Sequence, residues 1–259
     1  MRAMASDTTG EKVWITGAGS GIGRAIALRF LRAGATVLAS GRDPAPLDAL
    51  AADAGVPPQA VGVHAVDVTD RGAVRQAVAD MQVRAGPIDR VILNAGTYQP
   101  VEADGFDAAA FDRQFAVNVG GVVNCLEAII PAMRARGAGQ IALVGSLSGY
   151  RGLRRASAYG ASKAAVMRIA ESLRQDQAPA GIDVRLVSPG FVRTPLTDRN
   201  DFAMPFLVEV DDAAERIYRG LVHGHAFEIA FPRRLAWPVR LASMLPYGLY
   251  FSMMRRVTG

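Results

Sequence analysis

The chain of 259 residues is predicted to fold as a single α/β domain whose doubly wound parallel sheet carries helices on both faces. Strand-like apolar runs alternate with amphipathic helical runs along its length, and strands joined by helices lie parallel with right-handed crossovers. A glycine-rich turn directly follows the first strand-like run, as at the carboxyl edge of such sheets. About half of the residues are apolar, which is enough for one substantial core, and no linker or repeat divides the chain.

The elements follow from periodicity and from the residues that end each run. Gly34 ends the first helix, and Pro44 suits the first turn of the second. The expected strands cover residues 12–16, 36–40, 61–66, 90–93, 140–144, 183–187 and 227–231. The expected helices cover residues 22–32, a segment from 44, 71–84, a long run over 111–136, and 157–178.

Cysteine content and the N-terminus indicate the compartment. The one cysteine, Cys125, excludes an intramolecular disulfide and fits a reducing environment; inside an apolar helical run it is expected to be a buried structural thiol. Residues 1–12 lack the apolar core of a signal peptide, and no run of 18 apolar residues occurs. We therefore expect a cytoplasmic protein without a membrane-spanning segment.

The formal net charge is +5, yet the arginines are spread along nearly every helix and are not interleaved with aromatic residues. This distribution disfavours nucleic-acid binding and indicates attraction for small anions. His64, His223 and His225 lack nearby carboxylates or thiols at ligand spacing, so we expect no metal site.

The glycine-rich turn spans residues 16–23 and opens the first helix. There, backbone N–H groups and the helix dipole favour a pyrophosphate. Gly17 permits the tight turn, Gly21 lets phosphates approach the backbone, and Gly23 permits close packing of the helix. A merely flexible loop is the alternative interpretation.

Tyr159 and Lys163 are spaced to lie on one face of a helix, where an enzyme would use them as a proton donor and its tuner. Only two of the 29 basic residues are lysines, so a lysine at this place is informative. A phenol titrates near pH 10 and exchanges protons poorly at neutral pH unless a nearby cation stabilises the phenolate. An ordinary exposed helical pair is the other interpretation.

Three motifs, in this order, resemble the classical short-chain dehydrogenase/reductase family: the glycine turn, Asn94-Ala95-Gly96 after the fourth strand, and Tyr159 with Lys163. The resemblance covers about residues 12–231. It implies a Rossmann fold and hydride transfer between a nicotinamide and a carbonyl or secondary alcohol.

Catalytic roles come with this resemblance. Tyr159 matches the catalytic acid/base, and Lys163 matches the lysine that lowers the pKa of the tyrosine and holds the nicotinamide ribose. Ser146 matches the serine that polarises the substrate carbonyl, with Ser148 as the weaker candidate. Asn118 matches the asparagine that kinks the long helix and supports a proton relay through water.

Cofactor contacts are implied in the same way. Asp67 would contact the adenine, although capping of a turn competes with this role, and the segment from Ser188 to Thr194 would contact the nicotinamide amide. The residues expected to bind the cofactor are Gly17, Ser20, Gly21, Ile22, Gly23, Arg42, Asp67, Val68, Asn94, Ala95, Gly96, Tyr159, Lys163, Pro189, Gly190 and Thr194.

The end of the second strand indicates which dinucleotide binds. Members that bind NAD carry an acidic residue there for the ribose hydroxyls, whereas this chain has Gly41 followed by Arg42. Arg42, with Arg24, would pair with a 2′-phosphate. We therefore expect NADP(H) rather than NAD, although Arg42 as a solvated loop residue is the alternative and Asp43 weakens the argument.

Two further segments concern the substrate. Residues 194–210 occupy the place of the substrate lid, and Phe202, Met204, Phe206 and Leu207 would either contact an apolar, lipid-like substrate or pack on the core of the protein. Residues 232–259 form an apolar and basic C-terminal extension, interrupted by proline and too short to span a bilayer. It is expected to contact a membrane peripherally, or to cover the core or a subunit interface.

The expected activity is reversible reduction of a small-molecule carbonyl to an alcohol with NADPH. A non-catalytic NADP(H)-binding sensor or membrane scaffold is the alternative, and a nucleotide-sugar epimerase fits the glycine spacing less well. A homodimer or homotetramer through residues 111–136 and 157–178 is implied by the family.

Overall fold

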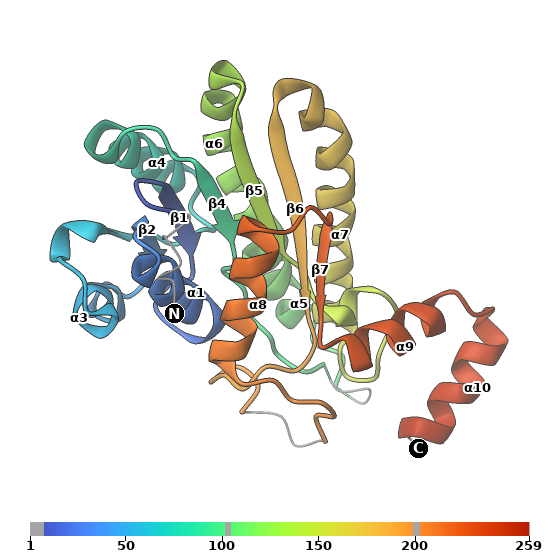
Figure 1. The fold of residues 1–259 in the computed structure, drawn as a ribbon. Coiled ribbons are helices and arrows are strands. Elements are labelled where there is room, and N and C mark those ends of the chain that lie inside the picture. Colours follow the sequence, from blue (N-terminus) through green and yellow to red (C-terminus); the bar gives the residue numbers. More distant parts are fainter. Residues whose placement is uncertain (1–7, 102–104, 199–202, 259) are drawn as a thin grey trace.

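The computed structural model describes residues 8–101, 105–198 and 203–258. Within them, seven strands form one parallel sheet in the order β3-β2-β1-β4-β5-β6-β7 (Figure 1). The strands are β1 (Lys12–Thr16), β2 (Thr36–Gly41), β3 (Val61–Ala65), β4 (Arg90–Leu93), β5 (Gly139–Val144), β6 (Ile182–Pro189) and β7 (Glu228–Phe231). The predicted doubly wound sheet is confirmed, with β1 and β4 adjacent at its centre.

Helices cover both faces of the sheet, and each face has its own core (Figure 1). One face packs against α1 (Gly21–Arg32) and α8 (Val210–Val222). The other packs against α4 (Arg71–Ala85), α6 (Gly121–Arg136) and α7 (Ser157–Gln177). Short helices α2 (Ala45–Asp48) and α3 (Leu50–Ala54) follow β2, and Pro44 stands at the N-cap of α2 as predicted for a helix start.

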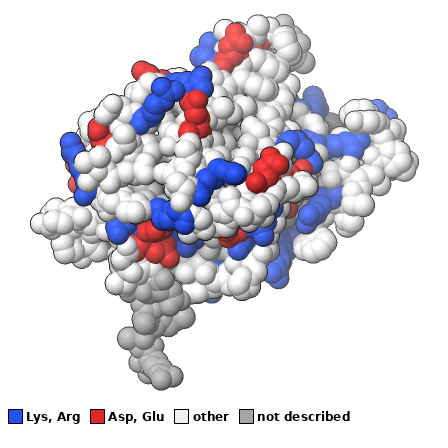
Figure 2. Space-filling view, turned by 90° about the horizontal axis from the view of Figure 1, so that it is seen from above, with Lys and Arg blue, Asp and Glu red and all other residues white. Residues whose placement is uncertain are grey.

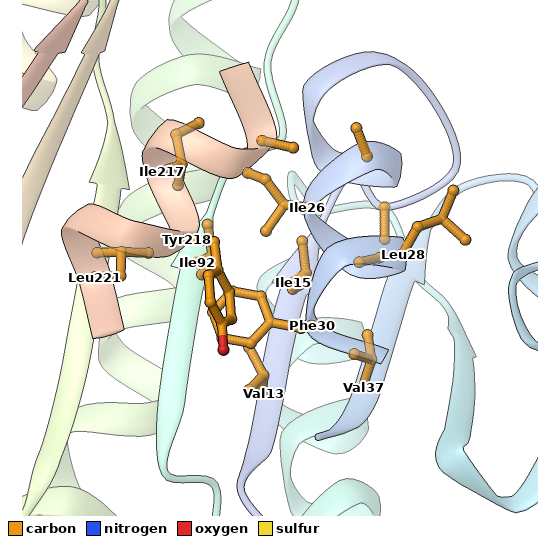
Figure 3. Packing of buried hydrophobic residues seen from close by; sticks show 14 of the residues in the cluster. Val13, Ile15, Ile26, Leu28, Phe30, Val37, Ile92, Ile217, Tyr218 and Leu221 are labelled. Atoms are coloured by element: carbon orange, nitrogen blue, oxygen red, sulfur yellow. The ribbon is translucent and has the colours of Figure 1, made fainter. Parts of the chain in front are cut away.

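The contact between α1 and α8 fixes two segments that border the carboxyl edge of the sheet. The Phe30 and Tyr218 rings meet edge to face at 5.0 Å between centroids, and the Arg29 guanidinium lies 3.6 Å from the centroid of the Tyr218 ring. Figure 3 shows these rings above Val13 and beside Ile15 of β1. Because the glycine turn precedes α1 and the lid precedes α8, this packing holds the two segments relative to each other.

The long helix begins earlier than expected, and it changes its hydrogen-bonding pattern. It consists of α5 (Ala108–Phe115), a π-helical segment (Ala116–Gly120) and α6. By length and composition alone, Ala108–Arg136 is the one described helix that would cross a membrane. Its inner side, including Val122, Leu126 and Ile129, is buried in the second core, which makes it a core helix of this fold.

The C-terminal extension forms two helices, α9 (Arg233–Ser243) and α10 (Tyr247–Thr258). Contrary to expectation, the helix continues through Pro238, and the chain turns only at Met244, Leu245 and Pro246. In Figure 1, α9 leaves the sheet beside β7 and α10 projects at the edge of the molecule.

Candidate active site

The glycine turn forms a cradle that only glycine fits. Gly17 and Gly21 have φ values of +67° and +50°, in the region that side chains rarely adopt. A Cβ at Gly23 would lie 2.2 Å from the Gly17 carbonyl oxygen and 2.4 Å from Asn94 Nδ2. Ser20 stands at the N-cap of α1 without a side-chain hydrogen bond to the helix, and the first turn, with Ile22, contains no acidic residue. The cradle therefore suits an anion such as the pyrophosphate of a dinucleotide.

The loop after β4 is fastened to this turn. Thr16 Oγ1 accepts the backbone N–H groups of Asn94 and Ala95, both at 3.0 Å. Asn94 Nδ2 donates to the Thr16 carbonyl at 3.1 Å and to the Gly17 carbonyl at 3.3 Å. Asn94 therefore steadies the sheet edge. Thr16, which was not among the predicted site residues, is the acceptor at the centre of this network.

Ser146 and Tyr159 meet at the carboxyl edge of β5. Ser146 Oγ accepts the Ser148 backbone N–H at 3.1 Å, which places the hydroxyl at the start of a 3₁₀ turn. Tyr159, on the first turns of α7, shares a hydrogen bond with Ser146. Ser148 thus supports Ser146 through its backbone, and Ser146 is the serine that contacts the phenol.

Lys163 lies one turn further along α7 and is buried. Its Nζ donates to the Val144 carbonyl at 2.8 Å and lies 5.8 Å from the centroid of the Tyr159 ring. Burial lowers the pKa of the amine to about 8 because the charged form loses hydration.

The pKa of Tyr159 is raised in the chain alone, whereas the resemblance implied a lowered one. Burial raises it most, the Ser146 hydrogen bond lowers it, and the neighbouring Tyr98 raises it further. The Lys163 ammonium is directed to the Val144 carbonyl, which explains why burial dominates at the phenol.

Asn118, in the π-helical segment, is fully buried and uses both ends of its amide. Oδ1 accepts the Thr97 N–H at 2.8 Å, and Nδ2 donates to the Thr97 carbonyl at 3.0 Å and to Ser162 Oγ at 2.9 Å. A Cβ at Gly96 would lie 3.3 Å from Asn118 Oδ1 and 3.5 Å from Lys163 Nζ. The amide therefore joins the loop after β4 to α7 beside the buried amine.

Tyr98 is a site residue that sequence reasoning missed. Its ring meets the Tyr159 ring edge to face at 5.1 Å between centroids and an interplanar angle of 74°. The only sequence signal is its place two residues after Gly96, in the loop that leads to the site. Tyr98 screens the phenol from water and fixes the plane of its ring.

The two arginines that were expected to pair with a 2′-phosphate have different surroundings. Arg42 is exposed after β2, and its charge helps to lower the pKa of Asp67, after the larger effect of the Thr69 backbone hydrogen bond. Arg24 instead forms an ion pair with Asp53 of α3. Asp67 Oδ1 accepts from Thr69 N at 2.9 Å and from Thr69 Oγ1 at 2.8 Å, so it caps a turn.

The remaining expected cofactor residues lie around the same edge. Thr194 Cγ2 would be 3.3 Å from a Cβ at Gly21, which places Thr194 over the glycine turn. Gly190 follows Pro189, the last residue of β6, and its N–H donates to the Phe231 carbonyl at 2.7 Å. Val68 is buried, and its carbonyl accepts from Asn124 Nδ2 at 2.9 Å.

Parts of the lid lie at this edge as well. Val192 and Val208 form a parallel bridge, and the Phe206 side chain is 52% exposed rather than packed in the core. Met204 and Leu207 are half-buried, and Phe202 lies outside the described residues. No cluster of three His, Cys, Asp or Glu side chains occurs among the described residues.

Comparison with known proteins agrees with this geometry. Residues 11–203 match the model of the short chain dehydrogenase family. The chain is 39% identical over 247 residues to an uncharacterized oxidoreductase of Myxococcus xanthus, covering 94% of this chain and 96% of the relative. It is 34% identical over 190 residues to a 3-oxoacyl-[acyl-carrier-protein] reductase of Thermotoga maritima, covering 73% and 77% of the two chains.

Solved structures are similar over most of the chain. A short-chain dehydrogenase from Streptomyces avermitilis aligns with a TM-score of 0.80 and 28% identity, over 96% of this chain and 94% of that one. A 3-ketoacyl-(acyl-carrier-protein) reductase from Brucella melitensis, complexed with NADH, aligns with a TM-score of 0.77 and 30% identity, over 86% and 95%. The protein described here therefore belongs to the short-chain dehydrogenase/reductase family and is an oxidoreductase.

Proposed function

We propose that the protein is an NADP(H)-dependent reductase of an apolar, lipid-like carbonyl, acting reversibly on the secondary alcohol. The observation that carries the proposal is the hydrogen-bonded pair of Ser146 and Tyr159 beside the buried amine of Lys163. This group lies at the sheet edge that carries the glycine cradle, and a pure binding protein does not need it.

The bound cofactor would supply or accept a hydride at its nicotinamide ring. The cradle of Gly17, Gly21 and Gly23 would hold its pyrophosphate, and Arg42, which forms no ion pair within the described residues, would pair with the 2′-phosphate. Pro189, Gly190 and Thr194 would contact the nicotinamide end.

The side chains of the chain then have distinct tasks in reduction. Ser146 and Tyr159 hold the carbonyl oxygen, and Tyr159 releases its proton to that oxygen as negative charge develops there. Because its pKa is raised, the Tyr159 phenol stays protonated until the carbonyl is reduced. Lys163, charged below about pH 8, attracts the phenolate that forms and favours its reprotonation. Asn118 holds the loop after β4 and helix α7 in place around the Lys163 amine. A water molecule near Asn118 would complete the proton relay to Tyr159.

Support for an apolar substrate comes from the lid and from the relatives. Phe206, in the expected lid, exposes about half of its surface, which a hydrophobic substrate would cover. Two similar proteins are named as reductases of 3-oxoacyl or 3-ketoacyl groups on acyl carrier protein, that is, of ketones on acyl chains. We expect a cytoplasmic homodimer or homotetramer, with the exposed Val123 of α6 in its interface.

A screen of NADPH consumption tests the proposal. Short, aromatic, steroid and long-chain ketones are offered to the enzyme with NADPH and with NADH. We expect turnover with long-chain or other apolar ketones and a higher kcat/KM for NADPH than for NADH. Tight binding of NADPH without turnover of any carbonyl would favour the sensor or scaffold alternative instead.

A further inference from the structure

We propose that the outer face of the C-terminal helix pair, α9 and α10 (residues 233–258), is a docking surface for an anionic lipid bilayer. The first argument is the distribution of charge. Residues 232–259 contain five arginines and no acidic residue, whereas the rest of the chain contains 24 basic and 24 acidic residues. The whole formal net charge of +5 therefore lies in this short segment.

Exposed apolar side chains gather on the same helix pair. Trp237 and Leu241 on α9 and Met244 at its C-cap follow one another at helical spacing and are 60–77% exposed. Tyr247 and Phe251 stack at 5.9 Å on α10, and both are more than half exposed, as is Leu249. Large exposed apolar clusters mark interaction sites on folded proteins.

Charge and apolar surface share one side of each helix. On α9, the spacing places Arg233, Trp237 and Leu241 in line, and on α10 it places Tyr247, Phe251 and Arg255 in line. Basic residues beside aromatic rings are typical of helices that lie in the lipid headgroup region. At 11 and 12 residues, neither helix is long enough to cross a bilayer.

Two side chains, Arg151 and Tyr250, fasten the pair to the protein. Arg151 donates to the Ser243 carbonyl at 2.5 Å and to the Leu245 carbonyl at 3.2 Å, and its guanidinium lies 4.3 Å from the centroid of the Tyr247 ring. The buried Tyr250 donates through its hydroxyl to the Gly152 carbonyl at 2.7 Å. Tyr247 therefore shares in this attachment, whereas Trp237, Leu241 and Met244 remain 60–77% exposed.

Charge also decides against the other occupants of this face. Arg240 pairs with Glu228 of β7, so a second copy in a two-fold interface would set the same patch against itself and bring the other four arginines of each copy together with no carboxylate in the segment to pair them. Nucleic acid would leave Leu241 and Met244 without apolar partners. An anionic bilayer satisfies both features, because its headgroups pair with the arginines and its acyl boundary accepts the apolar side chains.

Figure 2 agrees with the separation of charge. On the body of the molecule, blue and red side chains alternate, in line with its many ion pairs. The lobe at the right edge of the view, where α10 projects in Figure 1, shows blue and white.

Co-sedimentation of the full chain with vesicles tests the proposal, using phosphatidylcholine alone or mixed with phosphatidylglycerol. We expect binding to the mixed vesicles only, weakened by salt. Arg255→Gln/Arg256→Gln is expected to weaken partitioning about 30-fold, since each arginine near an anionic surface is worth about fivefold. Arg75→Gln/Arg168→Gln removes the same charge from exposed sites on the body and is expected to change partitioning little. Equal losses in the two variants, or no binding to mixed vesicles, would overturn the proposal.

Tryptophan fluorescence reports whether the surface enters the lipid. Trp14 is fully buried and donates a hydrogen bond to Ser40, so a shift of the emission wavelength caused by vesicles reports on Trp237. We expect a blue shift with mixed vesicles that Trp237→Phe abolishes and that Leu241→Ser/Met244→Ser reduces. If the serine variant instead dissociates an oligomer in sedimentation velocity, the face is a subunit interface and the proposal is wrong. None of these measurements needs NADPH or a carbonyl, so they stand apart from the proposed reaction.

Discussion

At the scale of single residues, the site combines two groups whose protonation is shifted by burial. The Tyr159 phenol is held neutral, and the Lys163 amine titrates at about 8. For a buried lysine, the pKa in the folded state lies below the pKa in the unfolded state. Burial of the charged amine therefore lowers the free energy of unfolding in full below about pH 8, and this cost is relieved as the pH rises towards the unfolded pKa.

This titration predicts how dinucleotide affinity depends on pH. The charged amine attracts an anionic dinucleotide, so the affinity for NADPH is expected to fall severalfold as the pH rises from 7 to 9 and Lys163 loses its proton. Fluorescence titration of NADPH measures the affinity. The Lys163→Met variant should bind NADPH more weakly at pH 7, and its affinity should no longer fall as the pH rises. An equal decline in the variant would assign it to another group.

Arg42 carries the prediction of cofactor preference. Loss of a charge-assisted hydrogen bond to a 2′-phosphate costs about 1.5–3 kcal/mol. Arg42→Ala is therefore expected to weaken NADPH binding about 10- to 150-fold and to leave NADH binding nearly unchanged. Arg24→Ala is the matched control, because Arg24 already forms an ion pair with Asp53 and its loss should change NADPH binding little. A parallel loss for NADH and NADPH would contradict a phosphate contact at Arg42.

At the scale of elements, the glycine turn could be predicted in detail, because positive φ and close backbone approach leave glycine as the only solution. A kink at Asn118 was implied by the resemblance, but its π-helical form could not be predicted, since the segment looks helical by periodicity and Asn118 is held by tertiary hydrogen bonds to Thr97 and Ser162. The contact of Tyr98 with Tyr159 was missed for a similar reason, because loop geometry decides it.

The turn offers a test of stability at this scale. Gly23→Ala would press a methyl group against the Gly17 carbonyl, so we expect a loss of about 1–3 kcal/mol in the free energy of unfolding and weakened dinucleotide binding. Gly72→Ala, near the start of α4, meets only Asp70 Oδ1 at 3.4 Å and is expected to stabilise by about 0.5–1 kcal/mol. Urea unfolding measures both. A neutral Gly23→Ala would show that the turn has room to relax.

At the scale of the whole molecule, the parallel sheet and both helical layers followed from the alternation of elements and the handedness of crossovers. The course of the C-terminal extension did not. Its composition indicated an apolar and basic segment, but its fastening by Arg151 to the loop between Ser146 and Tyr159 depends on contacts 92 and 94 residues apart. Through this loop, the proposed bilayer surface adjoins the candidate active site.

If both proposals hold, substrate carried in a bilayer should reach the enzyme preferentially. With a long-chain ketone dissolved in anionic vesicles, we expect a higher rate than with neutral vesicles, and Arg255→Gln/Arg256→Gln should abolish the difference. A short water-soluble ketone serves as the control and should be reduced equally by both enzymes. A similar loss with the short ketone would indicate damage to the site.

The most direct test of the central claim, that Tyr159 donates the proton in carbonyl reduction, is a single-turnover measurement with Tyr159→Phe on the ketone found by the screen. Stopped-flow absorbance follows oxidation of NADPH bound before mixing, and titration checks its affinity. We expect unchanged NADPH affinity and a rate of NADPH oxidation lowered by about 10²- to 10⁴-fold, the usual contribution of a general acid. Tyr98→Phe, which keeps the ring contact, should retain most of the rate. A Tyr159→Phe enzyme that oxidises bound NADPH at the wild-type rate would contradict the account.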